Sequence, residues 1–113
     1  MTAEFLQHVQ QAFRAVQDEQ VAAIASFDGG LTIMRDAWDR TGGGGGDTRA
    51  FSQGEVIEKG GLNFSAVEGD VGPALQEQLQ TKATRFAATG VSSVLHPLNP
   101  HVPIIHMNVR YFS

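Results

Sequence analysis

Three polar side chains that can bind an anion or move a proton alternate near the end of the chain. His106, Asn108 and Arg110 are separated by single residues, so in an extended strand they point to one face. Histidine titrates near neutral pH and can serve as an acid or a base, whereas arginine can hold a carboxylate through two parallel hydrogen bonds. The outer two residues lie ~13 Å apart in a strand, at ~3.3 Å per residue. This spacing indicates a ligand of macrocycle size.

A β-type run over residues 91–95 predicts a second strand, followed by a loop whose three prolines exclude a helix. If this strand pairs with the last one as a hairpin, residues whose numbers sum to 200 lie opposite each other, and Ser92 faces Asn108. His96 then lies on the same polar face as His106. A metal ion bound by these two histidines would need further ligands, because their spacing matches no zinc signature.

The C-terminal third is cationic, although the whole chain carries a formal net charge of −4. The last carboxylate side chain is that of Glu77. Beyond it, the ionisable side chains are those of Lys82, Arg85, Arg110, Tyr111 and the histidines at 96, 101 and 106. We therefore expect this part of the chain to face a partner that carries carboxylates.

The composition excludes several classes of protein. The chain has 113 residues, which suits one domain or part of one, with 12 Asp and Glu against 8 Lys and Arg. Without a cluster of basic residues, binding to a nucleic-acid backbone is not expected. The absence of cysteine excludes disulfides, thiolate metal sites and a cysteine nucleophile. No apolar stretch reaches the ~18 residues of a membrane span and no signal peptide begins the chain, so we expect a cytoplasmic protein.

Five consecutive glycines, Gly42 to Gly46, are the most unusual local feature. They lack the Lys-Ser/Thr of a phosphate-binding loop, and Asp47 stands where a dinucleotide-binding pattern needs its third glycine. Two interpretations stay open from the residues alone. The run is either a flexible linker or a loop whose bare backbone approaches a flat ligand or another chain.

The elements that must position these residues follow from the spacing of apolar side chains. The predicted elements are, in order, a helix over residues 2–28, strands and a glycine loop over 31–68, a helix over 73–89 and a β-hairpin over 91–112. Strands within the second segment are expected at 31–38, 55–58 and 62–67. The apolar stripe of the first helix comprises Phe5, Leu6, Val9, Phe13, Val16, Ile24 and Phe27. The second helix begins at Pro73, a favoured first-turn residue, and its inner face comprises Leu75, Leu79, Ala83 and Phe86.

Several of these stretches resemble oxygen-dependent coproporphyrinogen III oxidase. The similar stretches are Trp38-Asp39-Arg40, Glu58-Lys59-Gly60-Gly61-Leu62-Asn63-Phe64-Ser65, Leu95-His96-Pro97-Leu98-Asn99-Pro100-His101-Val102-Pro103 and His106-Met107-Asn108-Val109-Arg110-Tyr111-Phe112. The likeness extends from about residue 36 to the end of the chain. It includes the glycine run, which favours the functional interpretation of that run over a linker.

The resemblance implies an enzyme of haem biosynthesis. The family converts two propionates of coproporphyrinogen III to vinyl groups with O2, giving protoporphyrinogen IX, CO2 and H2O2. It works as a homodimer without haem, flavin or nicotinamide, and a divalent metal is assigned to several of its histidines. Its fold, a large flat antiparallel sheet covered by helices, agrees with the α+β class expected here.

The resemblance also implies roles for individual residues. His106 matches the family's proton donor, and His96 and His106 match two histidines assigned to the divalent metal. The residues that match the family's substrate-binding positions are Ser92, Asn108, Val109 and Arg110.

The family's chain is much longer than this one. We therefore expect residues 1–113 to be the N-terminal part of a single larger catalytic domain and to be inactive alone. Two alternatives stay open: a non-catalytic porphyrin- or metal-binding module, and a purely structural fragment.

Overall fold

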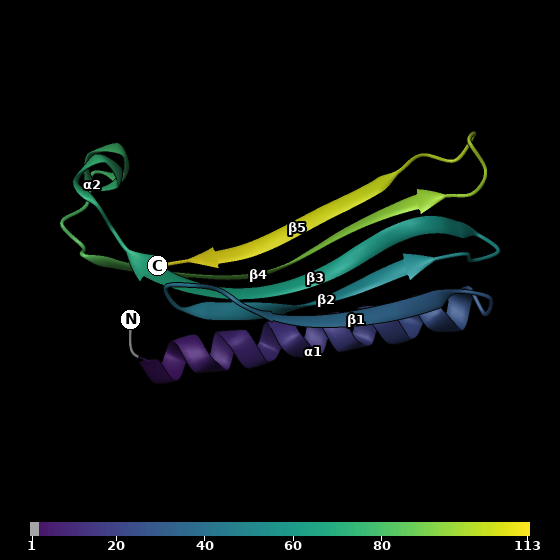
Figure 1. The fold of residues 1–113 in the computed structure, drawn as a ribbon, viewed down its shortest axis with the longest axis horizontal. Helices are drawn as coiled ribbons and strands as arrows, with labels where there is room; N and C mark the ends of the chain where they lie inside the picture. The colour runs from purple at the N-terminus through teal and green to yellow at the C-terminus, as the bar shows by residue number, and fades with distance from the viewer. Residues whose placement is uncertain (1–2) are drawn as a thin grey trace.

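The computed structural model describes residues 3–113 and has an α+β fold with one five-stranded antiparallel sheet (Figure 1). The elements are α1 (Ala3–Phe27), β1 (Thr32–Asp39), β2 (Gly44–Ser52), β3 (Ile57–Asp70), α2 (Pro73–Leu79), β4 (Arg85–Pro97) and β5 (Ile105–Phe112). The strands lie side by side in the order in which they occur in the sequence. The predicted class, an antiparallel sheet with helices, is confirmed.

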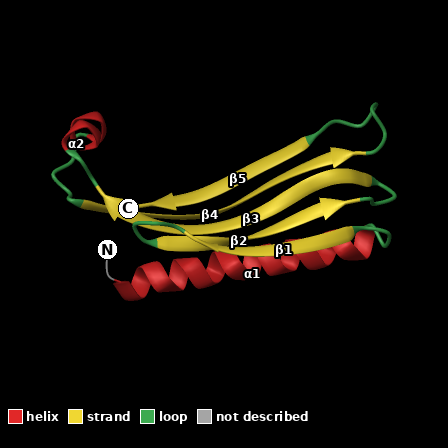
Figure 2. Cartoon of the chain, viewed as in Figure 1, coloured by secondary structure: helices red, strands yellow, loops and turns green. Residues whose placement is uncertain are grey.

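The two helices occupy different places relative to the sheet. α1 runs along one face of the strands, whereas α2 lies beyond one end of them, between β3 and β4 in the chain (Figure 2). Within residues 3–113, no helix covers the opposite face. Neither described helix is both long enough and apolar enough to span a membrane.

The core lies between α1 and the sheet. Its buried centre comprises Phe51, Leu62, Phe64 and Val91, from β2, β3 and β4. From α1, Phe13, Val21 and Ile24 pack against it. A slip of one residue in any strand would turn this apolar set to the other face, so the core fixes the register of the sheet.

The first helix follows its predicted bounds but contacts the sheet along a slightly different stripe. The most buried residue of α1 is Gln17, whereas the predicted stripe residues Val16 and Phe27 are 37% and 72% exposed. Residues 13, 17, 21 and 24 lie at four- and three-residue steps, and Val16 lies about 100° away from Gln17 around the helix. The predicted start at residue 2 lies outside the described residues.

The second helix is shorter than predicted. It begins at Pro73 as expected but ends at Leu79, where Gln80 adopts a left-handed conformation with φ 52°. The predicted extension to residue 89 is wrong, because β4 already starts at Arg85 and pairs there with Asp70 of β3. Phe86, predicted on the helix, instead stacks on Phe112 across the hairpin with ring centroids 6.0 Å apart.

The middle of the chain forms one long strand where two shorter ones were expected, and one strand that was not expected. β1 agrees with the predicted strand at 31–38, but β3 is one continuous strand, and residues 55–56 belong to the turn before it. β2 was not predicted as a strand. Gly42, Gly43 and Gly44 have positive φ angles of 101°, 130° and 87°, and the first two make the β1–β2 turn while Gly44 begins β2. The rest of the run lies in β2, which excludes a linker.

The C-terminal hairpin has the predicted register. Ser92 pairs with Asn108 and Val94 with His106, and the two strands are joined by the proline-rich loop. The numbers in each pair sum to 200, as predicted.

A buried carboxylate ties the end of α1 to the β2–β3 turn. Asp28 is 2% exposed and accepts hydrogen bonds from the backbone N–H groups of Glu55, Val56 and Ile57 at 2.9, 3.0 and 2.9 Å. The N–H of Ile57 lowers the pKa of Asp28 most, and together with the N–H groups of Glu55, Val56 and Gly30 it outweighs the opposing effect of burial.

Candidate functional site

The alternation of side chains gives the sheet two unlike faces. On β5, Met107 contacts Gln20 of α1, and Tyr111 packs edge-on against Phe5 with ring centroids 5.9 Å apart. These odd-numbered β5 residues therefore lie on the side of α1, which we call the helix face. The residues between them point to the other side, which we call the open face.

The register places the residues of the open face in three rows across all five strands. The first row is Met34, Ala50, Gly61, Val94 and His106. The second row is Asp36, Thr48, Asn63, Ser92 and Asn108. The third row is Trp38, Gly46, Ser65, Gly90 and Arg110. The rows cover roughly 19 Å across the strands and ~13 Å along them, at ~4.8 Å per strand and ~3.3 Å per residue.

The side chains at the centre of the open face are small and protrude little from the sheet. Gly46, Gly61 and Gly90 lie in β2, β3 and β4, beside alanine, serine and threonine. A Cβ atom at Gly61 would meet nothing closer than the carbonyl oxygen of Arg49 at 3.7 Å. A Cβ at Gly46 would instead collide with the indole of Trp38, which therefore lies against the bare backbone there. A flat ligand can approach the backbone at Gly61.

The predicted site residues gather along the β4–β5 edge of the open face. His106, Asn108 and Arg110 are exposed, and half-buried Ser92 lies opposite Asn108. Val109 is different, because its side chain lies on the helix face opposite Val91. Only the backbone of Val109 is placed to contact a ligand on the open face.

Charge is distributed unevenly on the open face. Lys59 of β3 lies opposite His96 and was not singled out from the sequence. Lys59 on β3 and His106 and Arg110 on β5 make the half of the open face from β3 to β5 basic. The acidic Asp36 lies on β1, at the opposite edge. Carboxylates of a ligand would therefore be attracted to the β4–β5 side.

The two predicted metal ligands share the open face but do not complete a metal site. His96 is diagonal to His106, because Val94 is the residue directly opposite His106. Among the described residues, no group of three or more His, Cys, Asp and Glu side chains is close enough to hold a metal ion. The two imidazoles could supply part of a ligand set, whereas zinc usually takes four ligands.

A chain of hydrogen bonds that sequence reasoning missed crosses three strands of the open face. The indole Nε1 of Trp38 donates to Thr48 Oγ1 at 3.1 Å, and Thr48 Oγ1 donates to Asn63 Oδ1 at 2.6 Å. The signal for Asn63 was present in β3, where Asn63 and Ser65 alternate with the larger apolar residues Leu62 and Phe64. No comparable signal marked Thr48, since β2 itself was not predicted.

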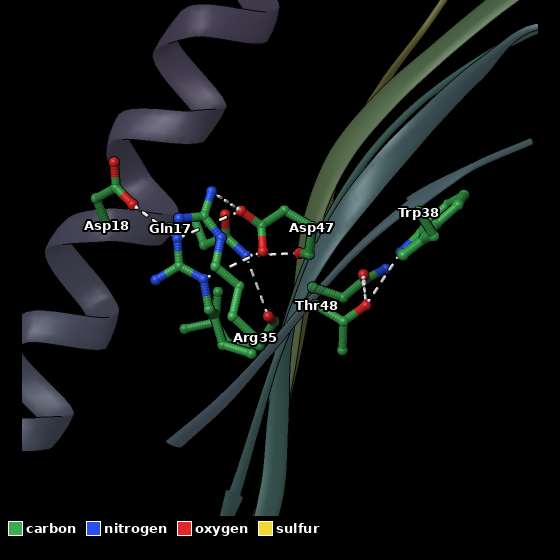
Figure 3. A network of polar contacts seen from close by, with 9 residues as sticks. Gln17, Asp18, Arg35, Trp38, Asp47 and Thr48 are labelled. Carbon is green, nitrogen blue, oxygen red and sulfur yellow. Dashed lines mark hydrogen bonds and ion pairs between the residues drawn. The ribbon is translucent and has the colours of Figure 1, made fainter.

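A second polar network lies on the helix face and holds the sheet to α1 (Figure 3). Asp47, 2% exposed, pairs with Arg35 at 2.7 Å and with Arg49 at 3.1 Å. Burial opposes ionisation of Asp47, but the hydrogen bonds and charges of the two arginines outweigh it and lower the pKa of Asp47. Gln17 donates to the carbonyl oxygens of Asp47 at 2.7 Å and of Leu62 at 3.2 Å. Figure 3 shows this network on the side of α1, with Thr48 and Trp38 on the other side.

An apolar cavity of about 800 Å³ lies away from the predicted site residues. It is lined by Ile24 and Phe27 at the end of α1 and by residues of the proline-rich loop, including Leu98 and Val102. Its lining contains no histidine or arginine, and its one ionisable side chain is the carboxylate of Glu55, so it lacks the cationic groups that the sequence predicts for binding an anion. The candidate site is therefore the open face and not this cavity.

Comparison with known proteins points to one family. The family described as coproporphyrinogen III oxidase matches residues 8–113. An oxygen-dependent coproporphyrinogen-III oxidase from Prochlorococcus marinus (strain MIT 9313) is 46% identical over 100 residues, which are 87% of this chain and 29% of that protein. The protein of the same name from Parasynechococcus marenigrum (strain WH8102) is 44% identical over 100 residues, 87% of this chain and 28% of that protein. The chain thus spans less than a third of the length of these relatives.

Proposed function

The chain belongs to the coproporphyrinogen III oxidase family, and we propose that its open face binds coproporphyrinogen III for oxidative decarboxylation. In this proposal residues 1–113 are the N-terminal part of a larger catalytic domain. The observation that carries the proposal is the open face itself, in which a glycine-rich centre lies beside the basic edge formed by His106 and Arg110. A flat ring with several carboxylates matches both features.

Arg110 is proposed to hold a propionate of the substrate. Its guanidinium is permanently charged and can give two parallel hydrogen bonds to one carboxylate. Asn108 and Ser92, in the neighbouring row, offer further donors at the same edge. The backbone of Val109 lies between Asn108 and Arg110 in β5.

His106 is proposed to supply a proton. For each propionate, the bond to the carboxyl carbon and one C–H bond of the neighbouring side-chain methylene break, and a C=C bond forms. O2 takes up the two electrons and leaves as H2O2, and one proton is consumed for each CO2 released. An exposed histidine beside the ligand can provide that proton near neutral pH. O2 is the co-substrate, and no organic cofactor takes part.

A second candidate function is porphyrin binding without turnover. It is favoured by the exposure of His106, Asn108 and Arg110 among the described residues. Catalysis of this kind gains from the exclusion of water from the reacting groups. Binding would need only the residues of the open face, whereas turnover is proposed to need the rest of the catalytic domain as well.

Three further properties are proposed by likeness to the family. They are assembly of the complete enzyme as a homodimer, location in the cytoplasm, and a divalent metal held in part by His96 and His106. A metal content measurement on wild type and on His96→Ala would test the last of these directly.

The experiment uses two proteins. The 113-residue chain is titrated with coproporphyrin III, a stable fluorescent analogue of the substrate. A chimera joins this chain to the remaining part of the Prochlorococcus relative and is assayed for O2-dependent decarboxylation. We expect the chain alone to bind but not to turn over, and the chimera to be active. The remaining part of the relative, added in trans, should restore some activity.

The matched variants are His106→Ala and His8→Ala, both made in the chimera. His8 is an exposed histidine on α1, away from the open face. Loss of a positioned acid typically lowers the rate by ~10²- to 10⁴-fold. We therefore expect His106→Ala to lower kcat by that amount with a much smaller change in KM, and His8→Ala to change neither. Equal losses in kcat and in affinity would contradict the role of His106 as proton donor.

A further inference from the structure

The hydrogen bonds among Trp38, Thr48 and Asn63 form one chain of donation, from Trp38 to Thr48 and from Thr48 to Asn63. An indole N–H can only donate, so Thr48 Oγ1 must accept from Trp38 at 3.1 Å. The single hydroxyl proton of Thr48 is then free to donate to Asn63 Oδ1, 2.6 Å away. The oxygen of the Asn63 amide is thereby held toward β2.

The opposite end of this amide is left for a ligand. With its oxygen fixed on Thr48, Asn63 directs its NH2 group away from β2. Within residues 3–113 this NH2 group donates no hydrogen bond, and the Asn63 residue is half-buried on the open face. An amide NH2 carries two donors and no acceptor, so it matches a carboxylate and does not match the N–H groups of a pyrrole ring.

The position of Asn63 places these donors at the middle of the face. Asn63 lies on the central strand β3, directly opposite Ser92, and Ser92 lies directly opposite Asn108. The three polar side chains therefore form one line that ends at the basic β5 edge. Adjacent members of this line are separated by one strand spacing of ~4.8 Å.

We infer that Asn63 is a further substrate-binding residue, whose NH2 group donates to a propionate carboxylate, and that Thr48 and Trp38 are positioning residues that fix its direction. The inference rests on the proposed function, because it takes the tetracarboxylate ring as the ligand of the open face. It adds a donor that lies outside the β4–β5 hairpin.

The test measures binding of two probes to four proteins. The probes are coproporphyrin III and its tetra-amide, which has the same ring but neutral side chains. The proteins are wild type, Asn63→Asp, Thr48→Val and Thr48→Ser. Aspartate keeps the shape of asparagine but replaces the donor by a negative oxygen, valine keeps the shape of threonine without the hydroxyl, and serine keeps the hydroxyl.

We expect Asn63→Asp to weaken binding of coproporphyrin III by about 10- to 100-fold, as for loss of a hydrogen bond to a charged group. Binding of the tetra-amide should stay within about twofold of wild type. Thr48→Val should weaken coproporphyrin III binding by about 3- to 10-fold, and Thr48→Ser should restore it. If Asn63→Asp does not fold, Asn63→Ala with the same two probes replaces it.

Three results would overturn the inference. If wild type binds coproporphyrin III and Arg110→Ala weakens this binding while Asn63→Asp and Thr48→Val do not, the open face remains the proposed binding site and the role of Asn63 is wrong. If Asn63→Asp weakens both probes equally, its effect is structural and the role is also wrong. If wild type binds neither probe, the proposed function fails and the inference fails with it.

Discussion

Replacing Gly61 by alanine should raise stability and lower porphyrin affinity at the same time. Gly61 lies inside β3, and a Cβ atom there would meet only the carbonyl oxygen of Arg49 at 3.7 Å, an ordinary contact. Exchange of glycine for alanine at an unstrained position restricts the unfolded chain and stabilises the fold by about 0.5–1 kcal/mol. For a chain of this size the melting temperature should rise by roughly 3–6 °C.

The loss of affinity follows from where the added methyl group points. It stands on the open face in the same row as His106, where a flat ring would otherwise approach the backbone. A gap of ~0.5–1 Å forfeits a quarter to a half of each atom–atom attraction, which is worth ~0.1–0.2 kcal/mol. With ~20 such contacts lifted, the loss is roughly 0.5–2 kcal/mol, which weakens binding by about 2- to 30-fold in Kd. Valine at the same position should lower affinity further.

The assay combines thermal unfolding with fluorescence titration of coproporphyrin III. Gly72→Ala is the matched control, because Gly72 precedes α2, has φ −75° and has nothing within 4 Å of an added Cβ. It should leave the affinity unchanged. A Gly61→Ala protein that gains stability and still binds porphyrin like wild type would refute the placement of the ring over Gly61.

Three more outcomes are expected from single substitutions. Arg110→Lys should weaken coproporphyrin III binding by about tenfold although the charge is kept, because the planar fork is lost; equal binding would show that Arg110 is not a carboxylate clamp. Gln17→Met removes two hydrogen bonds from a buried site, so urea unfolding should show a loss of about 2 kcal/mol, and a loss below 0.5 kcal/mol, on the order of a surface substitution, would contradict this. Because the pKa of Asp28 is lowered from 3.8 by folding, its contribution to stability is present above that pH and lost as the pH falls through the folded pKa. Melting temperatures of Asp28→Asn should therefore depend less on pH below 4 than those of wild type, and identical acid dependence would count against the argument.

The β4–β5 hairpin was predictable because its two signals act together. The prolines of the loop exclude a helix, and the alternation of His106, Asn108 and Arg110 with apolar residues has the period of a strand. Once both strands are assigned, the centre of the loop determines the register and therefore the pairing of Ser92 with Asn108.

The elements and contacts that were not predicted from the sequence all depend on pairing between strands that are distant in the chain. β2 contains three consecutive glycines and has little strand propensity of its own, but it is paired on both sides, by β1 and β3. Pairing with β3 decides for a strand from residue 85 onward, so Phe86 lies in β4 and Ala83 lies in the loop before it. The bond from Thr48 to Asn63 depends on that same β2–β3 register, so it could not be found from either segment alone.

The division of the sheet into two faces explains how a bare, glycine-rich surface can persist in a folded protein. Glycine inside a strand is unfavourable, and the open face receives no packing from a described helix. The helix face compensates for this through Leu62 and Phe64, both 0% exposed, and through the Asp47 network that joins β1 and β2 to α1. Because a slip of one residue would exchange the faces, the same contacts that stabilise the fold also keep Asn63, His106 and Arg110 on the open side. Substitutions on the helix face should therefore act on stability alone, whereas those on the open face should change ligand binding, even where the two residues are neighbours in the sequence.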